Sequence, residues 1–221
     1  MAISAPARGV LSELVERHGE LSGSIEAIAA AAGAICDSFR SGHRLHICGN
    51  GPSHADALHV AGQLVNARAG RRRLSAERHA ALLGQPDGEW LAESLQAGLP
   101  AFVLGSNGAV VTAIVNELLS ADLLFAQELE AVGAGGDVLL ALSQNGSARN
   151  VVLAAEVARS LGMTVVTIAG DDAEGRQLAE VADVVVDVPE RTASEAHAWQ
   201  AWLCHAICEM IEAEMFPEGR A

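Results

Sequence analysis

RLHICGNGPSHADALH, residues 44–59, is the stretch that decides the fold. An apolar run with β-branched character leads directly into the turn GNGPS (49–53), and a helix-like segment follows, with Ser53 at the position expected for its cap. A strand, a glycine turn and a helix N-terminus in this order form an anion-binding site, because free backbone N–H groups and the helix dipole converge there. His59 and Gln63 lie one turn apart on the same face of the predicted helix.

Length and composition predict a single globular domain, because the chain has 221 residues and 50% of them are hydrophobic. The formal net charge of −14 argues against nucleic-acid binding, which requires clustered positive charge. A phosphorylated ligand would need a local pocket of amide dipoles, hydroxyl groups or metal to overcome this charge. Lysine and tyrosine are both absent from the sequence, which excludes Schiff-base catalysis by lysine and acid–base roles for a phenol.

The sequence contains no secretory signal pattern and no apolar stretch of transmembrane length. The four cysteines, Cys36, Cys48, Cys204 and Cys208, have spacings that fit neither a zinc knuckle nor a secreted disulfide framework. Cys204 and Cys208, one helical turn apart, are interpreted as reduced core thiols. A cytoplasmic location without membrane attachment is the resulting expectation.

Strand and helix patterns alternate along the chain, after two helices predicted within 8–41. The predicted strands are 44–49, 101–105, 137–143, 164–170 and 183–189. The predicted helices that follow them are 53–68, 109–119, 121–133, 147–162, 174–181 and 194–216. Nearly continuous apolar strands in a β–α alternation predict an α/β fold with a parallel sheet covered by helices on both faces. The domain prediction is one unit over 1–221, with N-terminal helices in 1–43.

Residues 70–100 interrupt this alternation with two short helical patterns around the turn at 85–88. The run Arg71-Arg72-Arg73 could bind an anion, but a solvated basic turn is the favoured interpretation. Trp90, with Leu91 and Leu95, could form a contact face for another subunit or pack onto the parent domain, and the sequence leaves both open.

A second phosphate-type loop, SQNGS (143–147), lies between the third strand and its helix. Its polar side chains and glycine can supply several donors to a phosphate. It could instead be an ordinary capped helix start, with Ser147 or Asn145 as the cap. The carboxyl ends of parallel strands share one edge of the sheet, so the loops 49–53, 105–108 and 143–147 should meet there. Two such loops in one sheet favour a ligand site.

Three segments in order, GNGPSHADALH, DVLLALSQNGSARNVV and GMTVVTIAGDD, with a closing ADVVVDVP, resemble the sugar isomerase (SIS) domain. Within it the chain is similar to the phosphoheptose isomerase family over nearly its whole length, apart from 70–100. The resemblance implies a doubly wound five-stranded sheet and a homotetramer with active sites between subunits that often hold zinc. It also implies a sugar-phosphate substrate, since the family interconverts sedoheptulose 7-phosphate and a heptose 7-phosphate.

The resemblance assigns phosphate or substrate binding to residues of both loops and of the segment after the second strand. These are Asn50, Gly51, Ser53, Asn116, Ser143, Gln144, Asn145 and Ser147. Ser53 and Ser143 match the first serine of each family loop. Gln144 and Asn145 stand where the family has threonine and serine, and Ser147 falls on the family's asparagine. The phosphate site implied is therefore an altered one, which favours a different ligand.

The family's metal positions are a His-x3-Glu pair on the first helix of the domain and a Gln-x7-His pair on the last. The matching positions here are His59, Gln63, His197 and His205. Three imidazoles suit zinc, the implied cofactor, whereas a glutamine is a weak ligand. His197 and His205 are about 12 Å apart along a helix, so two fully reaching side chains or two subunits would have to share the metal. Alternatively, His205 is an ordinary packed histidine.

The family's favoured base is the glutamate at position 63, and a glutamine there cannot take a proton. Candidate bases are His197, His205, Glu195 and Glu117, the last following Asn116 where the family commonly has Asn-Asp. A bound metal would lower the demand on the base by stabilising an ene-diolate. The predicted function is a metal-assisted aldose–ketose isomerase acting on a seven- or eight-carbon ketose phosphate.

Two other functions remain open on the sequence. A relative of these isomerases is non-catalytic and associates with the replication initiator DnaA, and this chain shares with it the loss of the helix glutamate. A sugar-phosphate sensor that binds without turnover is the third reading. The additional imidazole at His197 favours the enzyme, because decay of a catalytic site removes ligands instead of adding one.

Overall fold

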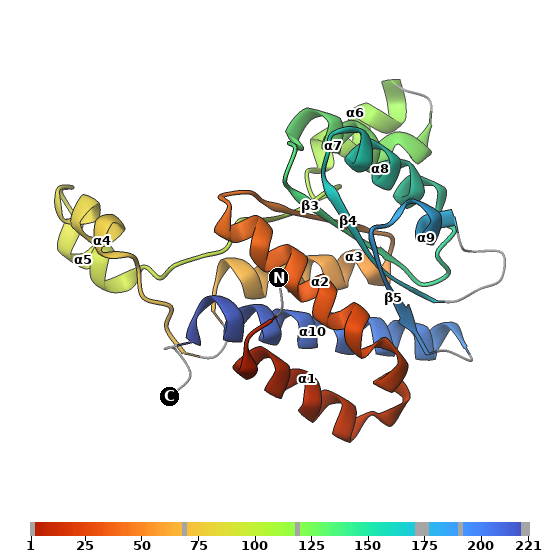
Figure 1. The fold of residues 1–221 in the computed structure, drawn as a ribbon. Coiled ribbons are helices and arrows are strands. Elements are labelled where there is room, and N and C mark those ends of the chain that lie inside the picture. The colour runs from red at the N-terminus through yellow and green to blue at the C-terminus, as the bar shows by residue number, and fades with distance from the viewer. Residues whose placement is uncertain (1–2, 68–69, 118–119, 171–176, 190–191, 218–221) are drawn as a thin grey trace.

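Five parallel strands form one sheet at the centre of the protein, in the order β2-β1-β3-β4-β5 (Figure 1). The computed structural model describes residues 3–67, 70–117, 120–170, 177–189 and 192–217. The strands are β1 (Leu45–Gly49), β2 (Ala101–Val103), β3 (Val138–Ser143), β4 (Thr164–Gly170) and β5 (Val184–Val188). The predicted parallel sheet is confirmed, and β2 is shorter than the predicted 101–105.

Helices cover both faces of this sheet (Figure 1). One layer holds α1 (Ala5–Arg17), the short 3-10 helix η1 (Gly19–Ser24), α2 (Ile25–Arg40), α3 (Pro52–Val65) and α10 (Ala193–Met215). The other holds α6 (Gly108–Glu117), the 3-10 helix η2 (Ala121–Leu123), α7 (Leu124–Val132), α8 (Arg149–Ser160) and α9 (Gln177–Val181). Helix α3 ends at Val65, before the predicted end at 68, and the predicted ends at 119 and 174 lie outside the described residues.

The side chains of β3 point alternately to the two faces of the sheet, which shows why both faces need a layer of helices. Val138, Leu140 and Leu142 pack into the core beneath α2, α3 and α10, while Leu139 and Ala141 pack into the core beneath α7 and α8. Successive side chains of a strand point to opposite faces, so a strand that is apolar throughout must be covered twice. The doubly wound α/β prediction is therefore confirmed.

The predicted helix caps are wrong. Helix α3 begins at Pro52, with Gly51 in the cap position at φ +52°, and Ser53 lies buried inside the first turn. Proline fits the first helical position because its fixed φ suits the helix and its missing N–H has no partner there. Helix α8 likewise follows Ala148 without a side-chain cap, so neither Ser147 nor Asn145 serves as one.

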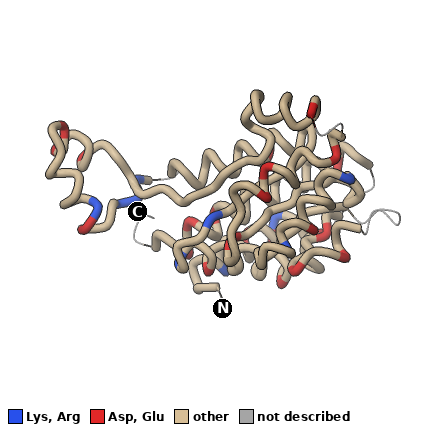
Figure 2. Tube along the Cα trace, turned by 90° about the horizontal axis from the view of Figure 1, so that it is seen from above, with Lys and Arg blue, Asp and Glu red and all other residues tan. Residues whose placement is uncertain are grey.

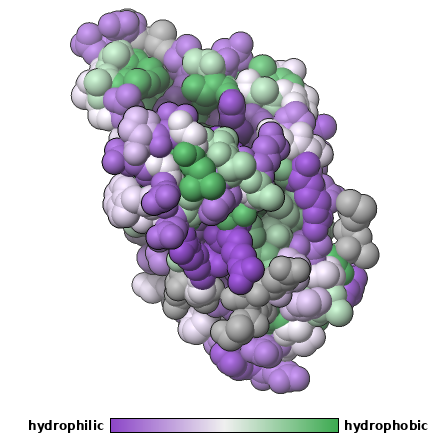
Figure 3. Space-filling view, turned by 90° about the vertical axis from the view of Figure 1, so that its left-hand side faces the viewer, coloured by the Kyte–Doolittle hydropathy of each residue, from purple (hydrophilic) through white to green (hydrophobic). Residues whose placement is uncertain are grey.

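Residues 75–95 form a helical hairpin that projects from the body, and we call it the arm (Figure 1). Its helices α4 (Ala76–Leu83) and α5 (Gly88–Ser94) meet at Gly88, where an added Cβ would lie 2.3 Å from the Leu82 carbonyl oxygen. Trp90 is 69% exposed, which contradicts packing onto the parent domain. Figure 3 shows the surface on this side of the molecule as hydrophobic patches divided by hydrophilic ones.

The four cysteines are free and buried, which confirms the prediction of core thiols made for Cys204 and Cys208. Burial raises the pKa of the Cys48 thiol to about 12 and also raises the pKa of Cys204, so neither forms a reactive thiolate at neutral pH. Among the described helices, none combines the length and the apolar composition needed to cross a membrane.

Candidate functional site

The loops that follow β1 and β3 meet at the carboxyl edge of the sheet, as predicted. Asn50 and Asn150 bond to each other through both amide groups, at 2.8 and 2.9 Å, and so join the first loop to the first turn of α8. Gly49 allows this approach, since an added Cβ would lie 2.8 Å from the Ser53 Cβ and 3.1 Å from the Leu142 oxygen. The loop after β2 borders the same place, because a Cβ on Gly105 would lie 3.8 Å from the His54 ring.

The second loop is held in shape by one side chain. The Asn145 Oδ1 accepts hydrogen bonds from the Ser143 hydroxyl and from the Ser147 backbone N–H, both at 3.3 Å. The backbone oxygen of Gln144 accepts from Gly170 N at 3.1 Å, which anchors the loop to the end of β4. Hydroxyl and amide groups therefore gather just before α8, and their role in phosphate binding stays a prediction.

Polar side chains line the contact between α3 and α10, and we call this line the polar seam. It consists of Ser53, Asp56, His59 and Gln63 on α3 and of His197, Gln200 and His205 on α10. The α3 members recur every three or four residues and so share one face of that helix. The seam starts at the anion-type loop and leads away from it along both helices.

Gln200 organises the first part of the seam. It is only 1% exposed, and its Nε2 donates to the Ser53 Oγ at 3.0 Å and to the Asp56 Oδ2 at 2.8 Å. The Ser53 hydroxyl also contacts the Gln200 Oε1 at 3.3 Å. Ser53, predicted to hold phosphate, is thus buried and already bonded. The backbone N–H groups of Ser53, His54 and Ala55 are also bonded, to the carbonyl oxygens of Asn50 and Gly51. The positive end of the α3 dipole is therefore what this turn offers an anion.

His197 stands beside Asp56, away from the other seam histidines. Its Nε2 lies 3.3 Å from the Asp56 Oδ2, within ion-pair distance, although that nitrogen is buried without a hydrogen bond. The His197 side chain as a whole is 39% exposed, so part of the ring remains accessible. The structure therefore joins His197 to a carboxylate and not to His205.

His59 and His205 face each other at the middle of the seam. Their Nε2 atoms are 3.1 Å apart, and the Gln63 amide lies 3.3 Å from the other ring nitrogen of His205, Nδ1. Two nitrogens bound to one zinc at about 2.0–2.1 Å each would be separated by about 3.3 Å, so the two imidazoles are correctly spaced for a shared ion. His205 is half-buried and paired, unlike an ordinary packed histidine.

The Gln63 amide faces His205 with its side-chain nitrogen, Nε2, 3.3 Å from Nδ1. Donation from this nitrogen leaves the His205 proton on Nε2, whereas the flipped amide, with its carbonyl oxygen toward Nδ1, leaves Nε2 as a lone pair. Metal ligation requires the second state. Within the described part of the chain, no three His, Cys, Asp or Glu side chains gather where they could hold a metal. The set expected from the sequence is thus present only as the His59–His205 pair, with Gln63 behind His205.

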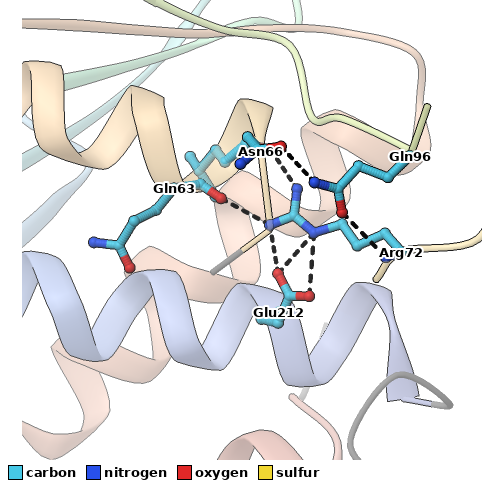
Figure 4. Close-up of polar contacts among 6 residues, drawn as sticks. Gln63, Asn66, Arg72, Gln96 and Glu212 are labelled. Atoms are coloured by element: carbon cyan, nitrogen blue, oxygen red, sulfur yellow. Dashed lines mark hydrogen bonds and ion pairs between the residues drawn. The ribbon is translucent and has the colours of Figure 1, made fainter. Parts of the chain in front are cut away.

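Arg72 closes the far end of the seam (Figure 4). The side chain is 3% exposed, donates to the Gln63 carbonyl oxygen at 2.8 Å and to the Leu64 carbonyl oxygen, and forms a bidentate ion pair with Glu212. Its guanidinium also lies 4.8 Å from the centre of the Phe216 ring. The prediction of a solvated basic turn is wrong for Arg72, because the last carbonyls of α3 need donors and an arginine can supply them. In Figure 4 the Gln63 side chain points away from this cluster.

The remaining predicted residues lie elsewhere. Asn116 and Glu117 are exposed at the end of α6, which contacts α7 and η2 on the other side of the sheet from the seam (Figure 1). Glu195 is exposed in the first turn of α10 and bonds to the N-cap Thr192. A single subunit therefore does not bring Glu117 or Glu195 into contact with the seam histidines.

Sequence reasoning missed Asp56, Gln200 and Glu212, and it assigned Arg72 to a solvated turn. The sequence spacing could have identified Asp56, since it lies three residues from both Ser53 and His59 and so shares their helix face. The other three become functional candidates only when α10 packs beside α3, which no local pattern reveals.

Comparison with known proteins shows which family this chain resembles. A family model described as SIS domain matches residues 11–94 and 90–170. A phosphoheptose isomerase of Geobacter sp. (strain M21) is 31% identical over 217 residues, which is 98% of this chain and 97% of that protein. The DnaA initiator-associating protein DiaA of Cronobacter sakazakii is 32% identical over 195 residues, covering 87% and 86% of the two chains.

A solved structure gives the same result for the fold. The phosphoheptose isomerase GmhA from Neisseria gonorrhoeae superposes with a TM-score of 0.70 at 25% sequence identity, over 91% of this chain and 94% of that one. The similarity therefore extends over both helical layers as well as the sheet.

Proposed function

We infer that this chain, which belongs to the SIS domain family, is a phosphosugar isomerase acting on a seven- or eight-carbon ketose phosphate such as sedoheptulose 7-phosphate. One observation carries the inference. A polar seam runs from an anion-type loop to two facing imidazoles, in a chain whose relatives over nearly its full length include phosphoheptose isomerases.

The phosphate would bind where the two loops meet. The groups there are Asn50 and Gly51 in the turn that precedes α3 and the side chains of the second loop, and the positive end of the α3 dipole adds to their attraction for an anion. Ser143, Gln144, Asn145 and Ser147 are the second-loop members. Acidic residues are spread over the body, with arginines at the base of the arm, so local dipoles must attract the phosphate (Figure 2).

We further propose that zinc binds between His59 and His205, with Gln63 selecting the tautomer of His205. When bound, zinc would polarise the sugar carbonyl and stabilise the charge of an ene-diolate. The pair is accessible from the surface, since His205 lines a cavity of about 450 Å³ together with Trp202 and Glu209. A ligand could reach the histidines from this side.

Isomerisation requires a group that moves a proton between adjacent carbons. Gln63 has no proton-accepting atom at neutral pH, so we assign this role to an imidazole of the seam. We also propose the family's homotetramer with sites between subunits. In that assembly a neighbouring copy would have to supply Asn116 and Glu117, because α6 of the same chain lies across the sheet.

The test uses protein without a histidine tag. Zinc is quantified, and sedoheptulose 7-phosphate is followed by NMR in deuterated water with and without a chelator. We expect about one zinc per chain and deuterium at the carbon next to the carbonyl, both lost in His59→Ala and His205→Ala. His79→Ala, an exposed change in the arm, is the matched control. Full zinc content and full exchange in the His59 and His205 variants would reject the site.

A non-catalytic protein-binding role is the second candidate. Gln63 in place of an acidic residue and a DiaA relative at 32% identity both favour it. Capture of purified initiator protein DnaA by this chain, without deuterium exchange in any phosphosugar, would support this role over the enzyme. Binding of a sugar phosphate without exchange and without capture would support a sensor.

A further inference from the structure

Asp56 and His197 form a polar pair to which the isomerase scheme above assigns no individual role. The pair lies between the two parts of the proposed site. Asp56 is one turn beyond the anion-type loop and one turn before His59, and His197 is 3.3 Å from its Oδ2. A sugar with its phosphate at the loop and its carbonyl toward His59 would have to pass this pair.

Asp56 is held in place by a buried partner. The Gln200 Nε2 donates to the Asp56 Oδ2 at 2.8 Å and to Ser53 at 3.0 Å. Both helices therefore determine where the carboxylate points. A side chain fixed by a buried hydrogen bond can orient a neighbour without the entropy cost of ordering itself.

His197 presents one buried nitrogen to this carboxylate and keeps part of its ring accessible. Asp56 is the charged group within ion-pair distance of His197 among the described residues, and the other seam imidazoles, His59 and His205, contact each other. A carboxylate that orients an imidazole and stabilises its protonated form is the arrangement that makes histidine an effective base.

We propose that His197 is the acid–base catalyst of the isomerase and that Asp56 is its positioning residue; this rests on the proposed function. The ring nitrogen that does not face Asp56, Nδ1, takes the proton from the carbon next to the carbonyl, and the C–H electron pair forms the C=C bond of the ene-diolate while the carbonyl oxygen takes the negative charge. The imidazolium returns the proton to the neighbouring carbon as the hydroxyl proton passes between the two oxygens. This assignment supplies the base that Gln63 cannot be.

The experiment measures kcat and KM of the full-length protein. Asp56→Asn keeps an acceptor for Gln200 but removes the charge, so we expect kcat to fall about 10- to 100-fold with little change in KM. Asp56→Glu should recover part of the rate. Asp87→Asn in the arm is the matched control.

A second variant keeps the test decisive if Asp56→Asn folds poorly. His197→Gln should lose a similar factor, and the double variant should be no slower than His197→Gln alone, because the two residues act as one unit. Effects that multiply, or an unchanged kcat in active Asp56→Asn, would overturn this inference and leave the isomerase intact. A wild-type protein that exchanges no deuterium into any phosphosugar would instead reject the proposed function, and the inference with it.

Discussion

The polar seam and the arm are both pairs of packed helices, yet they are built in opposite ways. The seam joins side chains 141 to 147 residues apart in the chain and gathers polar groups between helices. The arm joins neighbouring helices through a local turn and leaves Leu83, Trp90 and Leu95 exposed. The contacts of the arm are local in the sequence, whereas those of the seam form only when α10 packs beside α3.

Arg72 connects these two regions, and removing it should have the largest effect. Arg72→Ala would leave Glu212 and the last carbonyls of α3 without their donor, so we expect a loss of about 3–5 kcal/mol in unfolding free energy. Urea denaturation measures this loss. Arg73→Ala, an exposed neighbour, should change stability by less than about 0.5 kcal/mol. Equal stability of the two variants would show that the seam does not depend on this clamp.

Glu214 provides a second anchor for α10, on the side that faces α1 and α2. Burial alone would raise its pKa, but hydrogen bonds from Ser4 and Arg40 outweigh burial and lower the pKa to about 2. A lowered folded-state pKa means that the contribution is complete above the unfolded value of about 4.5 and is lost as pH falls through about 2.

The expected result is that Glu214→Gln costs roughly 1–3 kcal/mol at pH 7 and that the difference from wild type shrinks between pH 4.5 and pH 2. Urea titrations at a series of pH values measure it. The exposed Glu89→Gln in the arm should show no such pH dependence. A constant difference at every pH would mean that the carboxylate charge is not what holds Ser4 and Arg40.

Trp90 should have the smallest effect of the three. Because its ring is largely exposed, Trp90→Ser should change the unfolding free energy by no more than about 0.5 kcal/mol. Denaturation of the wild type and the variant tests this, and sedimentation of both reports whether the arm contacts a second subunit. A loss above about 1 kcal/mol would show that the arm is packed in solution, and the contrast with the seam would then be smaller.

Local patterns predicted most of the elements. β4 occupies the predicted residues 164–170, and the other strands differ mainly by a residue or two at their ends. The errors fall where tertiary contacts compete with local rules. Ser53 was expected to cap α3, but that helix begins at Pro52 with Gly51 in the cap position. The Ser53 hydroxyl is instead hydrogen-bonded to Gln200. Arg72 was predicted to be solvated because it lies within an arginine run, but it forms a buried ion pair with Glu212.

The sequence by itself determined the parallel sheet, the two glycine-containing loops at its carboxyl edge and the positions of His59 and His205, because periodicity and turn chemistry act over a few residues. Only the tertiary structure decided which partner each histidine contacts. Packing α10 beside α3 sets His205 against His59 and places His197 against Asp56. The physical reason is that side chains eight residues apart on one helix project in different directions, so each takes the partner that the facing helix presents.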